Sequence, residues 1–113
     1  MHLTVTEQEG ISVVNVAGKL DIGACGEFKS RMRCIADDGT GNILLDMSGI
    51  TEIDSSGIGV LVALLNSVRA GGGDLRLAGG FDRKVDEAFK LCGLDRVFIH
   101  YENVKVGIQQ FDR

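Results

Sequence analysis

The chain has 113 residues and a formal net charge of −4, and 44% of its residues are hydrophobic against 25% charged. This composition is typical of a globular domain and excludes intrinsic disorder, which requires low hydrophobicity and high net charge. The acidic balance argues against nucleic-acid binding, because nucleic-acid binders present a basic stripe or patch.

The first forty residues predict a β-hairpin and a helix. Apolar and polar residues alternate from position 3, Glu9-Gly10 forms a turn, and residues 11–16 continue as a second strand that ends at Gly18. A helix is expected over residues 24–37, because three apolar residues fall at positions i, i+4 and i+7 of one face: Phe28, Met32 and Ile35.

The middle of the chain predicts a buried strand followed by a helix. Residues 42–47 contain a short apolar run, and residues 50–53 form a second short apolar segment. A helix is expected over residues 55–70, with one apolar face made of Ile58, Leu61, Val62, Leu65 and Val68.

The last third predicts a strand over residues 75–78, a helix over residues 81–92, a strand over residues 97–101 and a helix over residues 102–111. The order is therefore β-β-α-β-α-β-α-β-α. We expect one α/β domain over residues 1–113, in which a mixed sheet with parallel central strands packs against helices.

The cysteines and the apolar segments limit the sites that this domain can hold. Cys25, Cys34 and Cys92 cannot all pair within one chain, none belongs to a Cys-x-x-Cys motif, and only two histidines are present. We expect no metal site and no cofactor, and we interpret the cysteines as reduced, small apolar core residues. The longest apolar stretch, residues 58–65, is too short to cross a bilayer, and no secretory signal is visible, so we expect a cytoplasmic protein without membrane insertion.

Catalytic motifs are incomplete. The Gly57-Ile58-Gly59 sequence begins a dinucleotide-binding pattern, but Val62 stands at the third glycine position, and no phosphate-binding loop is present. Ser55 and Ser56 lack the preceding glycine of a nucleophile elbow. We therefore expect a binding protein and not an enzyme.

The remaining feature is the segment Asp54-Ser55-Ser56-Gly57-Ile58-Gly59, which leads into the helix over residues 55–70. Asp54 or Ser55 is expected to cap this helix, and the hydroxyl of Ser56 could bond to the backbone of its first turn. Each glycine costs about 1 kcal/mol inside a helix relative to alanine. We interpret the two glycines as leaving the helix start bare for the close approach of another molecule, at a terminus that favours an added phosphate.

Val60 and Leu64 make this helix apolar on nearly all sides. One interpretation is that both side chains are buried between layers of the fold. The other is that they form an exposed patch beside the serines, which would be a site for a protein partner.

Four segments together resemble a STAS domain of the anti-sigma factor antagonist type. Residues 54–59 match the family pattern D-S-[ST]-G-[LI]-G, residues 18–21 match G-x-L-D, and residues 72–77 match the glycine-led fourth strand. Residues 89–98 resemble F-x-x-[ST]-G-L-x-x-[VL]-F at every position except Cys92. The chain departs from the family at Cys92, where Ser or Thr is usual, at Gly23-Ala24-Cys25, where a hydroxyl residue is common, and at Asp82-Arg83, where a proline is common.

The resemblance implies a partner-switching function. The unmodified protein would bind an anti-sigma factor that is also a serine kinase with a histidine-kinase-like ATPase fold, and so release a sigma factor. Phosphorylation of Ser55 would end binding, and a PP2C-type phosphatase would reset the switch. The partner surface would include Asp21, Asp54, Ser56, Gly57, Ile58, Gly59, Val60 and Leu64.

Alternatives remain for one residue and for the function. Asp21 is interpreted either as a loop carboxylate or helix cap, or as part of the surface beside the acceptor serine. The rival functions are a non-switching STAS subunit of a lipid ABC transporter, a scaffold in a stress-signalling particle, and a weak nucleotide-binding module, which the missing phosphate loop disfavours.

Overall fold

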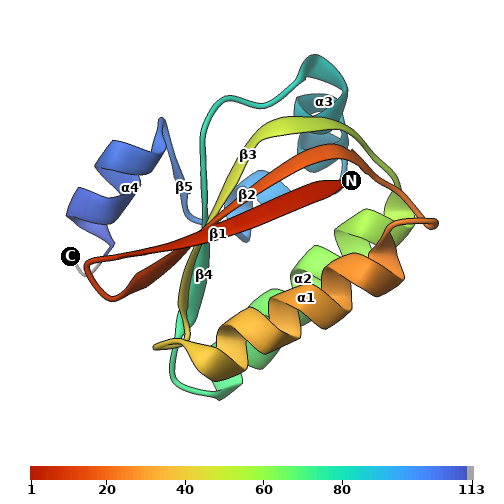
Figure 1. Cartoon of the computed structure of the whole chain (residues 1–113). Helices are drawn as coiled ribbons and strands as arrows, with labels where there is room; N and C mark the ends of the chain where they lie inside the picture. Colours follow the sequence, from red (N-terminus) through yellow and green to blue (C-terminus); the bar gives the residue numbers. More distant parts are fainter. Residues whose placement is uncertain (112–113) are drawn as a thin grey trace.

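The computed structural model describes residues 1–111 and contains a five-stranded sheet with the strand order β1-β2-β3-β4-β5 (Figure 1). The first pair of strands is antiparallel and the other pairs are parallel. The strands are β1 (His2–Gln8), β2 (Ile11–Leu20), β3 (Asn42–Ile53), β4 (Asp74–Ala78) and β5 (His100–Tyr101). The helices are α1 (Cys25–Asp38), α2 (Ser55–Ala70), α3 (Arg83–Leu91) and α4 (Val104–Gln110). The predicted α/β fold, mixed sheet and element order are confirmed, and residues 112–113 of the expected domain lie outside the described residues.

The β1–β2 hairpin closes through the predicted two-residue turn. Gln8 pairs with Ile11, and Glu9 and Gly10 both have positive φ angles, of 53° and 77°. Two consecutive positive φ angles are the condition of a type I′ turn, whose twist matches that of the strands it joins.

Strand β2 does not end at Gly18, as the sequence predicted, but continues to Leu20. Gly18 has a φ of 105°, and the pairing with β3 shifts register directly after it. Such an irregularity bends a strand without ending it. Residues 50–53 likewise are not a separate segment but the end of β3. As a result Leu20 pairs with Ile53, and the chain leaves both strands at the same edge of the sheet.

Helices α1, α2 and α3 cover one face of the sheet, and α4 covers part of the other (Figure 1). Alternation along β3 explains both layers, because Leu45 and Met47 face the first group of helices while Leu44 faces α4. None of the helices within residues 1–111 has the length and hydropathy needed to span a membrane.

The end of the chain is less regular than predicted. Helix α3 begins at Arg83, after Asp82, whose carboxylate accepts a hydrogen bond from the Lys84 backbone N–H at 3.0 Å. A 3-10 helix (Leu94–Arg96) follows α3, and residues 97–99 of the strand expected over residues 97–101 are irregular. Strand β5 keeps two residues, because it pairs only with the last two residues of β4.

The interpretation of the cysteines as core residues is wrong. Cys34 and Cys92 are exposed, and Cys25 is half-buried. Helix α1 buries Phe28 and Met32, and a residue two positions after Met32 lies on the opposite side of the helix. Cys92 caps the end of α3, where the chain turns away from the core.

Candidate functional site

The carboxylate of Asp54 joins the start of α2 to the loop after β2. Its Oδ1 accepts a hydrogen bond from the Gly57 backbone N–H at 3.0 Å, and its Oδ2 accepts one from the Ile22 backbone N–H at 3.0 Å. Asp54 is in the extended conformation that an N-cap residue adopts. Of the two candidate caps, Asp54 therefore caps the helix and Ser55 does not.

Asp21 organises the turn that leads into α1. Its Oδ1 accepts hydrogen bonds from the backbone N–H groups of Gly23 and Ala24, at 3.1 and 3.2 Å. Both donors precede α1, whose N-cap residue is Ala24 and has no side-chain cap hydrogen bond, so Asp21 is a loop carboxylate and not the cap of the helix. Asp21 and Asp54 both lie near Cys25. Partial burial raises the pKa of the Cys25 thiol, and the charges of Asp54 and Asp21 raise it further.

The two serines of the motif differ in exposure. Ser55, the first residue of α2, is exposed, and Ser56 is half-buried. Among residues 1–111 neither hydroxyl forms a hydrogen bond, so the backbone bond considered for Ser56 is not formed. The Ser55 hydroxyl therefore lies open to solvent at a helix N-terminus, where backbone N–H groups favour negative charge.

The two glycines of the motif have different roles. A Cβ on Gly57 would lie 2.3 Å from the backbone oxygen of Leu20 and 2.8 Å from Cγ1 of Ile53. Gly57 is buried, so its interpretation as a site of partner approach is wrong: it allows α2 to pack against the end of the sheet. A Cβ on Gly59 would meet nothing within 4 Å, so only Gly59 leaves the helix surface bare as predicted.

The exposed patch considered for Val60 and Leu64 is not formed. Leu64 is 8% exposed and belongs to the main core cluster, and Val60 and Ile58 are half-buried against that cluster. Helix α1 lies beside α2 and covers this side of it (Figure 1). The apolar surface of α2 is explained by this contact, because the helix packs against the sheet on one side and against α1 on another.

Ile22 is an exposed apolar residue that the sequence analysis did not select. Its side chain is 79% exposed, and its N–H is the donor to Asp54. The only signal for Ile22 in the sequence was a single apolar residue between Asp21 and Gly23. A single residue has no periodicity, so the pattern analysis did not select it. Ile22 therefore adds an apolar side chain to the surface around Ser55.

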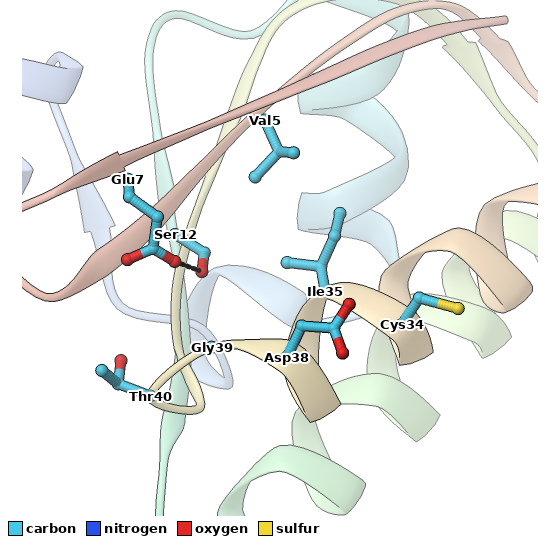
Figure 2. A pocket seen from close by; sticks show the side chains of 8 residues that line it. All are labelled: Val5, Glu7, Ser12, Cys34, Ile35, Asp38, Gly39 and Thr40. Carbon is cyan, nitrogen blue, oxygen red and sulfur yellow. Dashed lines mark hydrogen bonds between the residues drawn. The ribbon is translucent and has the colours of Figure 1, made fainter.

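A larger hollow lies away from the segment around Ser55, at the C-terminal end of α1. Figure 2 shows this 490 Å³ hollow, where Oγ of Ser12 donates a hydrogen bond to Oε1 of Glu7 at 2.9 Å. The length of α1, about 20 Å, lies between this hollow and the N-terminal end of the helix, which adjoins Asp54. It holds none of the predicted site residues; its lining is Val5, Glu7, Ser12, Cys34, Ile35, Asp38, Gly39 and Thr40. No group of three potential metal ligands occurs within residues 1–111.

The family follows from the match of the whole fold and of the motif at Ser55. The model of the STAS domain matches residues 2–107, which include every strand and helix described above except the last residues of α4. The chain belongs to the STAS domain family. The predicted resemblance is therefore confirmed.

Named proteins similar to this STAS domain come from several bacteria. The anti-sigma-B factor antagonist of Staphylococcus aureus is 27% identical over 94 residues, which are 83% of this chain and 86% of that protein. A crystal structure of a Thermotoga maritima protein, described as a candidate anti-sigma factor antagonist, superimposes with a TM-score of 0.89 at 24% identity and covers 98% of this chain and 95% of that one.

The anti-sigma factor antagonist SpoIIAA has been solved in two states. Its unphosphorylated form has a TM-score of 0.81 at 18% identity, covering 97% of this chain and 96% of that one. The phosphorylated Bacillus form has a TM-score of 0.73 at 17% identity, covering 97% and 99%. At these identities the structures show that the STAS domain has the same fold.

Proposed function

We propose that this STAS domain is an anti-sigma factor antagonist whose unphosphorylated form binds an anti-sigma factor, a serine kinase with a histidine-kinase-like ATPase fold. The observation that carries the proposal is the open Ser55 hydroxyl on the first residue of α2. The name shared by the Staphylococcus aureus and Bacillus subtilis relatives supports it. The partner surface consists of Asp21, Ile22, Asp54 and Ser56 together with Ile58, Gly59 and Val60 on the first turns of α2, without the buried Gly57.

Phosphorylation of Ser55 ends the complex by adding charge. A phosphate carries about −1.5 to −2 charges and would lie directly beside the carboxylate of Asp54. Asp54 already has both oxygens occupied by backbone N–H groups, so it cannot turn away without releasing the helix start or the loop. Burying an unpaired dianion in a partly apolar interface costs several kcal/mol, and ~3 kcal/mol weakens binding about a hundredfold.

The modification leaves the fold intact and is reversed by a second protein. Negative charge at a helix N-terminus is favourable by about 0.3–1 kcal/mol, which offsets part of the repulsion from Asp54. A PP2C-type phosphatase removes the phosphate and restores the binding form. In this scheme the chain is a substrate and a binding partner, and it has no catalytic residue or cofactor of its own.

Mass spectrometry tests the proposal. The protein is incubated with Mg-ATP and a candidate anti-sigma factor of the histidine-kinase-like ATPase fold, and the site of modification is mapped. We expect one phosphate, on Ser55, and none on Ser55→Ala, whereas the matched control Ser56→Ala is still modified. Phosphate on Ser56 alone would contradict the assignment. If the protein is not phosphorylated and instead binds a permease, the result favours the alternative function, a non-switching subunit of a lipid ABC transporter.

A further inference from the structure

A groove runs between α1 and α2 on the surface of the helical layer. It has a volume of 220 Å³, below the roughly 300–1,000 Å³ of small-molecule pockets, so it suits a side chain of a partner better than a cofactor. Its floor is apolar and consists of Ala36, Val60, Ala63, Leu64 and Val68.

The rim of the groove carries positive charge. Lys29 and Arg33, one helical turn apart on α1, line it, and within residues 1–111 neither forms a salt bridge. The other charged lining residue, Asp37, follows one turn later at the far end, and Ser67 is the polar residue contributed by α2. The chain as a whole is acidic, so this basic pair is a local exception that attracts negative charge.

The groove leads to the Ser55 end of the helices. On α1, Cys25 lies one turn before Lys29, and the charge of Asp54 acts on its thiol. On α2, Ser56 lies one turn before Val60 on the same side of the helix. The residues of α1 and α2 that line the groove therefore begin beside the segment around Ser55 and continue away from it along both helices.

We infer that this groove binds an acidic amphipathic helix of the anti-sigma factor. An apolar side chain of that helix inserts over Ala63 and Leu64, and carboxylates pair with Lys29 and Arg33. Asp37 at the far end repels acidic residues there, so the carboxylates of the partner lie over Lys29 and Arg33. The inference rests on the proposed function and adds to it a second contact, distinct from Ser55, that sets affinity and orientation.

Charge reversal tests the rim. The full-length anti-sigma factor that phosphorylates Ser55 is titrated with wild type, Lys29→Glu, Arg33→Glu and the matched control Lys105→Glu, whose lysine is exposed on α4 behind the sheet. We expect each groove variant to bind about fivefold to tenfold more weakly and to depend less on salt than wild type. Lys105→Glu is expected to bind like wild type. All three replaced side chains are exposed, so circular dichroism is expected to show an unchanged fold.

Filling the groove tests its floor. Ala63 is exposed, so Ala63→Trp occupies the groove without entering the core, and Gln109→Trp on α4 is the control. We expect Ala63→Trp alone to weaken binding of the anti-sigma factor.

If wild type binds and all groove variants bind equally well, the inference is wrong and the proposed function stands. If wild type binds no anti-sigma factor, both are wrong. If Ala63→Trp changes only self-association or only dephosphorylation, the groove serves a second copy or the phosphatase, which also overturns the inference.

Discussion

The carboxylate of Asp54 accepts a hydrogen bond from the backbone N–H of Ile22, 32 residues earlier in the chain, at 3.0 Å. Its other oxygen caps α2 through the Gly57 N–H. One side chain therefore holds both segments that flank the Ser55 hydroxyl. The geometry around Ser55, the proposed phosphorylation site, therefore depends on the neighbouring Asp54.

Removal of the Asp54 carboxylate is expected to destabilise the protein more than removal of an ordinary cap. Asp54→Ala loses the cap, worth about 0.5–2 kcal/mol, and the bond to Ile22, worth about 1 kcal/mol more. The control is Asp82→Ala, which removes the single cap bond of α3 to Lys84. Urea denaturation measures both, and equal losses would show that the Ile22 bond contributes nothing.

The two glycines of the motif are expected to respond in opposite directions to alanine. Gly57→Ala forces a methyl group against Leu20 and is expected to lose about 1–3 kcal/mol or more. Gly59→Ala meets open space inside a helix and is expected to gain about 0.5–1 kcal/mol. Thermal melts compare the two variants. A stabilised Gly59→Ala that binds the anti-sigma factor more weakly would also show that the partner approaches this turn closely.

Leu64 and Val60 are expected to differ when each is replaced by aspartate. Leu64→Asp places an unpaired carboxylate in the core and is expected to lower the melting temperature sharply, because the cost is several kcal/mol. Val60 is half-buried at the groove, so Val60→Asp is expected to lose less stability but to weaken binding of the anti-sigma factor. Thermal melts and calorimetric titration separate the two effects. Similar melting temperatures would contradict the burial of Leu64.

Acidic replacements of Ser55 test the charge mechanism. Ser55→Asp and Ser55→Glu are expected to bind the anti-sigma factor more weakly than wild type, whereas Ser55→Ala keeps most of the affinity. The mimics carry one charge where a phosphate carries nearly two, so the effect is partial. Added salt is expected to restore little of the lost affinity. The added charge would be buried in the complex, and salt screens mainly the interactions between exposed charges. Wild-type affinity in both folded acidic variants would exclude a repulsive switch.

Asp74 is expected to make stability depend on acid pH. Burial raises the pKa of its carboxyl group, but hydrogen bonds from Arg76, Arg69 and the Leu75 N–H outweigh burial and lower it. A lowered folded-state pKa contributes stability that is present above the unfolded pKa, about 3.9, and is lost as the pH falls through the folded value. Asp74→Asn is expected to lose about 1–3 kcal/mol at pH ~7 and to approach wild type at pH ~2.

Denaturant titration at both pH values measures this effect. The control is Glu52→Gln, since Glu52 also has a lowered pKa, mainly from its hydrogen bond with Lys84, but its side chain is 43% exposed against 18% for Asp74. Exposed ion pairs contribute little, so this variant is expected to behave like wild type. A difference between wild type and Asp74→Asn that stays constant with pH would contradict the role of the ionised carboxylate.

The element order and the motif could be predicted from the sequence because both depend on local patterns. The turn at Glu9-Gly10, the spacing of Phe28 and Met32, and the start of α2 after Asp54 each follow from neighbours in the chain. Backbone preferences and helical periodicity act over a few residues, so a single sequence contains them. The same holds for the choice of a capped, glycine-rich helix start as the candidate site.

Only the tertiary structure determined what each of these residues contacts. The role of Gly57 depends on Leu20, the burial of Leu64 depends on α1, and the second bond of Asp54 depends on Ile22. These partners come from segments distant in the chain. They meet because β2 continues past Gly18 and ends beside β3, a consequence of a register shift that no local pattern reveals. Packing between distant segments has no periodicity along the sequence, and therefore the exposed surface around Ser55 appeared only in three dimensions.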